Sequence, residues 1–270
     1  MWAMKQRWRW LAPQALTLGN LSCGLLASVL IVTDPQLSYA VWAALLVWTG
    51  ALLDAFDGPL ARKLGVSSRF GVAFDSVADF FSFGVAPGVT AAMILRMLTE
   101  PHLAHGLVWS VCGFYIFATA ARLARYSHQH LRPTGRSTPA SPPRKSTLGD
   151  RDFTGLPSPA AGLLLVTMAA LASIGKGELA DIALLGVAGV LGVLMVSHVR
   201  YRRAPSAWRA IRPRWLKGII VPAVLVGGVL NVGVTIASVL ACYVLLGWKS
   251  RRAIRREEAN EALHYPWPTP

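Results

Sequence analysis

Residues 54–79 read DAFDGPLARKLGVSSRFGVAFDSVAD and carry four of the 13 acidic residues of the chain. Both flanks of this stretch are apolar enough to lie in a lipid bilayer. An ionised side chain at the centre of a membrane helix costs roughly 2.5–3.5 kcal/mol on insertion scales. Four carboxylates in such a setting therefore need something that compensates their charge.

The spacing of the four aspartates indicates what that is. Asp54 and Asp57 are three residues apart, and Asp75 and Asp79 are four apart, so each pair shares one face of a helix. The intervening KLGVSS (63–68) suits a tight turn between two antiparallel helices. Folding at this turn brings the two acidic faces together. Clustered oxygen ligands suit a hard divalent cation such as Mg²⁺ or Mn²⁺.

Small and basic residues accompany the aspartates. Gly58 and Ala61 leave room beside the carboxylates for a bulky group to approach the backbone. Arg62 places a fixed positive charge one turn past Gly58, where it suits a phosphate oxygen. The alternative interpretation is a buried cluster of structural carboxylates that only packs helices together.

The motif as a whole resembles the signature DxxDGxxARx8Gx3Dx3D of the CDP-alcohol phosphotransferases, which displace CMP from a CDP-linked alcohol by the hydroxyl of a second alcohol. The match has no gap and comprises Asp54, Asp57, Gly58, Ala61, Arg62, Gly71, Asp75 and Asp79. Fixed residues at eight fixed positions make a specific pattern, because a single residue matches by chance roughly one time in ten to twenty.

The resemblance implies a role for each aspartate. Asp54, Asp57 and Asp75 would hold a pair of divalent ions, Mg²⁺ or Mn²⁺. Asp79 would also face the metals and take the proton of the attacking hydroxyl, so Asp75 and Asp79 are the expected catalytic residues. Whether Asp79 is base, ligand or both stays open at this point.

The resemblance also implies a site for the CDP group. Small residues would make room for the cytidine, and Arg62 would hold the diphosphate. On the first apolar run, two polar side chains one helical turn apart are expected to line the same pocket. The expected CDP site therefore comprises Gly58, Ala61, Arg62, Gly71, Thr17 and Asn20.

Three further stretches resemble the bacterial, membrane-integral phosphatidylserine synthase branch, which transfers the phosphatidyl group from CDP-diacylglycerol to L-serine. They are PQALTLGNLSCG (13–24), ARLARY (121–126) and FTGLPSPAAG (153–162), and the resemblance covers roughly residues 12–200. One departure is Pro13-Gln14, where that branch usually carries Pro-Asn.

The acceptor alcohol stays open between several compounds. Arg122 and Arg125 lie within one helical turn and suit the serine carboxylate or a lipid phosphate, or are ordinary basic flanks of a membrane helix. The acceptor is expected to be L-serine, with glycerol 3-phosphate, inositol phosphate and choline as alternatives. A cation-coupled transporter is the alternative from another functional class.

The composition indicates an integral membrane protein. Hydrophobic residues make up 54% of the 270-residue chain and charged residues only 15%, against about 25% charged in soluble domains. A net charge of +14 is also typical of proteins that bind nucleic acid, but the basic residues here lie between apolar segments, as the flanks of membrane helices do. We therefore expect the lipid bilayer, and no nucleic acid, as the partner.

The apolar runs predict an all-α integral membrane protein with about eight transmembrane helices: a six-helix catalytic core followed by a C-terminal hairpin. The last run, 218–248, is too long for one span, so we divide it near residues 231–233. The expected core spans are 16–32, 39 into the acidic motif, 70–98, 106–123, 159–174 and 179–196.

Charge sets the expected orientation. With eight spans both termini are cytoplasmic, and every Lys and Arg except Arg96 and Lys176 falls on that side. The aspartate motif then lies at the cytoplasmic face of the cell membrane. The expected parts are an interfacial segment (1–12), the catalytic transmembrane domain (13–200), a basic loop with the hairpin (201–248) and a basic tail (249–270). The resemblance also implies a homodimer.

Overall fold

The computed structural model describes residues 2–66, 68–98, 105–131, 153–175, 178–197, 200–201 and 232–246. Helices make up nearly all of this part of the chain, which confirms the all-α prediction. The elements are α1 (Trp2–Thr33), α2 (Leu37–Leu64), α3 (Arg69–Asp79), the π-helix η1 (Phe80–Val85), α4 (Ala86–Leu98), α5 (His105–Leu131), β1 (Phe153–Thr154), α6 (Ser158–Gly175), α7 (Glu178–Val196), β2 (Arg200–Tyr201) and α10 (Val232–Leu246).

Six helical segments among the described residues are long and apolar enough to cross a membrane, so the chain is a multi-pass membrane protein. They are Leu11–Thr33, Leu37–Leu64, Phe70–Leu98, His105–Arg125, Ser158–Gly175 and Leu179–Val196. These six match the expected core spans. Of the expected C-terminal hairpin, the structure describes α10, whereas residues 218–231 lie outside the described residues.

Two helices extend beyond the apolar runs that predicted them. The helix α1 is continuous from Trp2 to Thr33, so the segment expected as a separate interfacial element joins the first span. The helix α5 continues to Leu131, past the expected end near residue 123. The backbone hydrogen bonds of an α-helix are internal and do not require apolar side chains. A helix can therefore extend beyond the apolar run that crosses the membrane.

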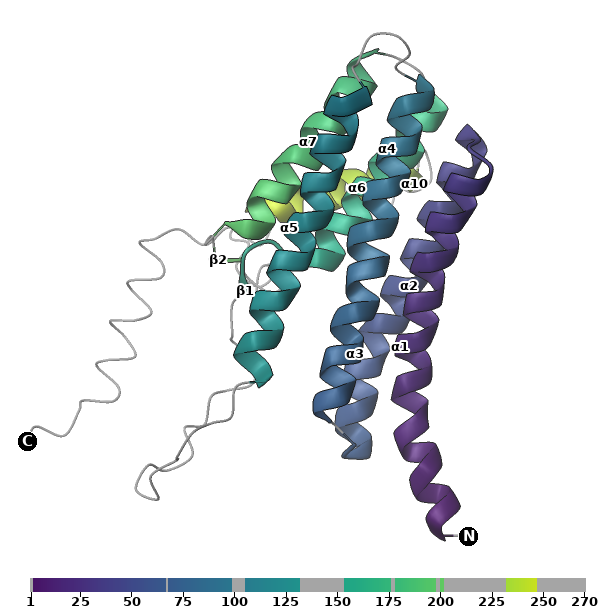
Figure 1. Cartoon of the computed structure of the whole chain (residues 1–270), viewed down its shortest axis with the longest axis vertical. Coiled ribbons are helices and arrows are strands. Elements are labelled where there is room, and N and C mark those ends of the chain that lie inside the picture. Colours follow the sequence, from purple (N-terminus) through teal and green to yellow (C-terminus); the bar gives the residue numbers. More distant parts are fainter. Residues whose placement is uncertain are drawn as a thin grey trace, which may run out of the picture.

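The helices pack closely through small residues. In Figure 1, α1 runs beside α2, and α6 lies among α2, α4 and α10. A Cβ atom added at Gly162 would lie 2.8 Å from the backbone of Phe83, and one added at Gly88 would lie 2.6 Å from Ile116. Glycines at these positions allow the close helix approach on which association in lipid depends.

The turn between α2 and α3 is built by its own residues. Gly65 adopts the left-handed conformation (φ 67°), and its N–H donates to the Arg62 carbonyl at 3.2 Å. Ser68 caps α3, because its Oγ accepts from the N–H of Gly71 at 3.0 Å. The tight turn predicted from residues 63–68 is therefore confirmed, and it reverses the chain so that α3 lies against α1.

The third span is interrupted by a π-helical turn directly after the acidic motif. The N–H of Ala86 donates to the Phe81 carbonyl, five residues back. Pro87 gives the reason for this turn, because its ring clashes with the carbonyl four residues earlier in a regular α-helix. The sequence pattern alone predicted one uniform helix here.

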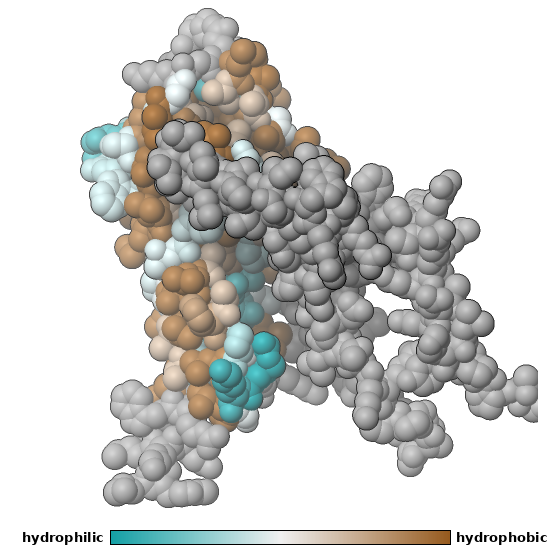
Figure 2. Space-filling view, turned by 180° about the vertical axis from the view of Figure 1, so that it is seen from behind, coloured by the Kyte–Doolittle hydropathy of each residue, from teal (hydrophilic) through white to brown (hydrophobic). Residues whose placement is uncertain are grey.

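Hydrophobic side chains cover much of the outer surface that the structure describes (Figure 2). On α1 and α2 the exposed apolar residues include Leu18, Leu25, Trp42, Leu52 and Phe56. Such a surface suits lipid rather than water. The N-terminus, the α2–α3 turn and the C-terminal end of α5 lie at the same end of the bundle (Figure 1).

Candidate functional site

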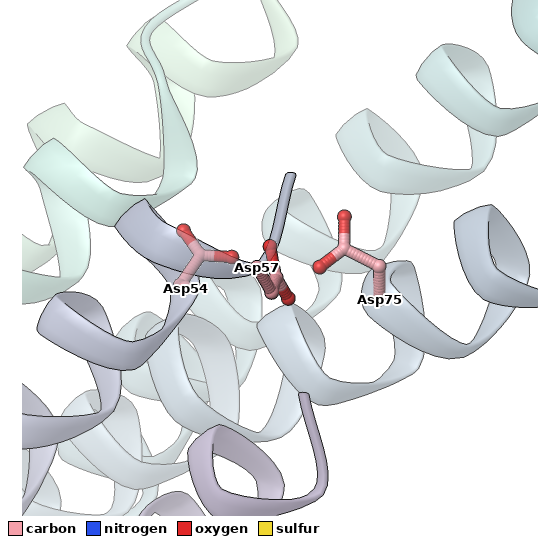
Figure 3. Close-up of side chains that lie close together, drawn as sticks. All are labelled: Asp54, Asp57 and Asp75. Atoms are coloured by element: carbon pink, nitrogen blue, oxygen red, sulfur yellow. The ribbon is translucent and has the colours of Figure 1, made fainter. Parts of the chain in front are cut away.

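Three carboxylates meet between α2 and α3. Asp54 and Asp57 lie near the end of α2, and Asp75 faces them from α3, so the turn at Gly65 brings the two halves of the motif together as predicted (Figure 3). One ligand oxygen from each of the three lies within 4.8 Å of the others. Two ionised carboxylates at such a separation repel each other by roughly 3 kcal/mol or more at an effective dielectric constant of about 20.

The arrangement fits a divalent cation. Asp57 is buried, and Asp54 and Asp75 are half-buried, so water compensates their charge only in part. The Oδ1 atom of Asp75 is buried and has no hydrogen-bond partner among the described residues. This oxygen and the oxygens of the two neighbouring carboxylates form a set of oxygen ligands, which Mg²⁺ and Mn²⁺ prefer. These three residues could therefore hold a metal ion.

The first helix supports the cluster. The Thr17 hydroxyl is buried and donates to Asp57 Oδ2 at 2.8 Å, while the Pro13 carbonyl lies 3.1 Å from the same hydroxyl. We expected Thr17 to line a nucleotide pocket, and the structure shows it in hydrogen-bond contact with Asp57. A hydrogen bond of this kind orients a ligating carboxylate.

Asp79 lies one turn beyond Asp75, outside the group of three. Its Oδ1 accepts a long hydrogen bond, 3.4 Å, from Nδ2 of Asn20, which is fully buried on α1. Ser82 holds the backbone at this position, because its Oγ donates to the main-chain carbonyl of Asn20 at 2.7 Å. The aspartate expected to act as a base is thus held by α1, and Asn20, like Thr17, contacts an aspartate of the motif.

The small and basic residues of the motif surround the aspartates. Arg62 is exposed, and its Nη1 atom would lie 3.4 Å from a Cβ atom added at Gly58, so its guanidinium lies over that glycine. Ala61 and Gly58 are half-buried. Gly71 packs against α1, since an added Cβ would lie 3.5 Å from Nε2 of Gln14.

Two arginines of α5 are bonded to neighbouring helices. Arg122 is 8% exposed, and its Nη1 donates to the Ser158 hydroxyl at 2.9 Å at the start of α6. Arg125 is half-buried and donates from Nη1 to the Val196 carbonyl at 3.3 Å. These contacts connect α5 to α6 and to α7. The second half of the FTGLPSPAAG stretch forms the first residues of α6.

Sequence reasoning missed the hydroxyl contacts around the site. Ser76 and Ser127 lie 2.8 Å apart and join α3 to α5, one residue beyond Asp75. Ser82 connects the third span to α1. Lone serines carry no spacing signal, because their partners lie on other helices.

Comparison with known proteins gives a consistent result. The sequence model of the CDP-alcohol phosphatidyltransferase family matches residues 10–196. The chain is similar to three proteins named CDP-diacylglycerol–serine O-phosphatidyltransferase. The identity is 34% over 159 residues for that of Bacillus subtilis, covering 58% of this chain and 74% of the relative. It is 31% over 162 residues for that of Helicobacter pylori (60% and 58%). For that of Methanocaldococcus jannaschii it is 34% over 128 residues (47% and 49%). The chain thus spans about half to three quarters of the length of these relatives.

Proposed function

The chain belongs to the CDP-alcohol phosphatidyltransferase family, and we propose that it transfers the phosphatidyl group from CDP-diacylglycerol to L-serine, giving phosphatidylserine and CMP. The observation that carries the chemistry is the group of three carboxylates, Asp54, Asp57 and Asp75, at the end of two candidate membrane spans. The names of the relatives support L-serine as the acceptor.

The carboxylates are proposed to hold two divalent ions, Mg²⁺ or Mn²⁺, with Asp79 beside Asp75 completing the set. Bound there, a metal pair supplies charge neutralisation for the bridging diphosphate of CDP-diacylglycerol. Four carboxylates provide enough oxygen ligands for two ions that share them. The hydrogen bond from Thr17 orients Asp57, and the contact with Asn20 orients Asp79.

The chain's own residues then position and activate the substrates. Arg62 binds the diphosphate, and Gly58 and Ala61 leave room for the cytidine, with Gly71 holding the helix close to α1. Asp79 accepts the proton of the serine hydroxyl. The serine oxygen forms a bond to the lipid-bearing phosphorus, the bond from this phosphorus to the CMP oxygen breaks, and CMP leaves with the electron pair.

The acceptor is proposed to bind near α5. Arg122 is a buried cation at the end of a candidate span, and its guanidinium is positioned by Ser158. A guanidinium of this kind suits the serine carboxylate, with Arg125 one turn further on. The same pair would suit the phosphate of glycerol 3-phosphate or inositol phosphate, so the acceptor needs its own test.

We further propose eight spans with both termini cytoplasmic and the aspartate cluster at the cytoplasmic face of the cell membrane. The position of the N-terminus, the α2–α3 turn and the end of α5 at one end of the bundle supports this orientation (Figure 1). A nucleotide reaches the cluster from the cytosol while the acyl chains stay in the bilayer. The working unit is proposed to be a homodimer.

The deciding experiment incubates purified protein with labelled CDP-diacylglycerol and Mn²⁺ or Mg²⁺, and adds L-serine, glycerol 3-phosphate, inositol phosphate or choline separately. We expect phosphatidylserine and stoichiometric CMP with serine, and no lipid product when the metal is chelated. If lipid product formed with one of the other alcohols but not with L-serine, serine would be overturned as the acceptor. Substrate flux across vesicles without CMP release would indicate a transporter instead.

A further inference from the structure

The π-helical turn η1 begins at the residue after Asp79. A tyrosine from another span donates a hydrogen bond to this turn. Tyr115 of α5 is fully buried, and its hydroxyl donates to the Phe83 carbonyl at 2.6 Å. We propose that Tyr115 is a positioning residue for phosphatidyl transfer: its hydroxyl holds the π-helical turn in the register that directs Asp79 at the carboxylate cluster. This inference rests on the proposed function.

Pro87 removes the N–H that the Phe83 carbonyl would meet in an α-helix, and a side chain from another span supplies a donor instead. In an α-helix the Phe83 carbonyl would accept from the N–H of residue 87, and that residue is Pro87, which has none. A buried carbonyl that loses its partner costs free energy. The Tyr115 hydroxyl lies where it replaces the missing N–H. The contact thus supplies a hydrogen bond to a buried carbonyl whose α-helical donor is absent.

Neighbouring backbones hold the turn from two further sides. A Cβ atom added at Gly24 of α1 would lie 2.6 Å from Ser82 Cα, and one added at Gly162 of α6 would lie 2.8 Å from Phe83 Cα. The turn is thus in backbone contact with α1 and α6, while Tyr115 reaches it from α5. A packed segment of this kind has few alternative positions.

The turn is coupled to Asp79 through α1. Ser82 Oγ donates to the main-chain carbonyl of Asn20 at 2.7 Å, and the side-chain Nδ2 of the same residue donates to Asp79 Oδ1 at 3.4 Å. Because a π-turn takes in one extra residue, it rotates the preceding helix by roughly 100° relative to the following one. A shift in the register of this turn would change that rotation and would move Asp79 relative to Asn20 and the cluster.

The test compares Tyr115→Phe, which removes only the hydroxyl, with Thr167→Val as a matched control. Thr167 is also buried, and its hydroxyl accepts from Trp48 Nε1 at 3.2 Å and donates to the Leu163 carbonyl at 2.6 Å, so it joins two spans through residues outside η1. For each full-length protein we would measure CMP release at saturating Mn²⁺, thermal unfolding, and amide hydrogen exchange in the peptide covering residues 79–86.

For Tyr115→Phe we expect kcat to fall roughly three- to tenfold, which corresponds to one hydrogen bond, while the KM for CDP-diacylglycerol changes less than about twofold. Exchange in residues 79–86 should be faster. Thr167→Val should unfold at a similarly lowered temperature with unchanged kcat and unchanged exchange in this peptide.

Three results would overturn the inference: equal losses of kcat in both variants, a loss of stability in Tyr115→Phe without a loss of kcat, or unchanged exchange in residues 79–86. The proposed function fails differently. If the wild-type protein released no CMP with any acceptor, that function would be contradicted, and the exchange comparison alone would decide whether the hydroxyl holds the turn.

Discussion

Two groups of charged side chains that the sequence singled out are stabilised in opposite ways. Asp54, Asp57 and Asp75 point toward one another with like charges (Figure 3). Arg122 and Arg125 instead donate to a hydroxyl of α6 and a carbonyl of α7. The protein partners of the arginines already account for their position. The mutual repulsion of the aspartates would be relieved by a bound cation, as proposed, and so they carry the stronger functional argument.

The largest effect expected from this comparison follows from Asp75→Asn. The substitution removes the carboxylate of Asp75, whose Oδ1 atom lacks a hydrogen-bond partner in the described part of the chain. Transition-state stabilisation of several kcal/mol would be lost, so CMP release should fall by about 10³-fold or more. Without added metal the variant should unfold at the wild-type temperature or above, because one repulsive charge is gone. Full turnover in this variant is incompatible with the assigned site.

Thr17→Val should have the next largest effect. It removes the hydrogen bond that orients Asp57 but keeps every carboxylate. Loss of such a supporting contact typically costs 10–100-fold in metal affinity or activity, so the Mn²⁺ concentration for half-maximal rate should rise by roughly tenfold. Thr49→Val is the control, since Thr49 is exposed and donates only to the Leu45 carbonyl of its own helix. Equal Mn²⁺ dependence in the two variants would remove Thr17 from the site.

Arg122→Lys tests the basic group. Lysine keeps the charge but loses the planar fork that reaches Ser158 and a bound carboxylate together. We expect the KM for serine to rise by about tenfold, while the Mn²⁺ dependence stays as in the wild type. Ser158→Ala should give a smaller rise of the same kind. An unchanged KM for serine would leave Arg122 with a purely structural role.

Arg125→Gln should have the smallest effect. This guanidinium is half-buried, and its bond to the Val196 carbonyl is long at 3.3 Å. The rate and the KM for serine should change by less than about threefold, as for an ordinary contact at a helix end. A loss as large as that of Arg122→Lys would show that the two arginines act as one site.

The sequence predicted the parts of the site that depend on local spacing. The helical pairs of aspartates and the turn at Gly65 follow from periodicity and glycine chemistry, and the apolar lengths predict the six core spans. The partners of Thr17, Asn20 and Tyr115 were not predictable in this way, because each lies on a different span. The effect of Pro87 on the third span was readable in principle, since a proline inside a helix removes a known donor.

The proposed function depends above all on cation binding by the aspartate cluster. Anomalous X-ray scattering from crystals of the protein grown with Mn²⁺ tests it most directly. We expect manganese peaks beside Asp54, Asp57 and Asp75 in the wild type, and loss of these peaks in Asp75→Asn. Wild-type crystals that show no manganese between these carboxylates, from protein that still releases CMP, would contradict it.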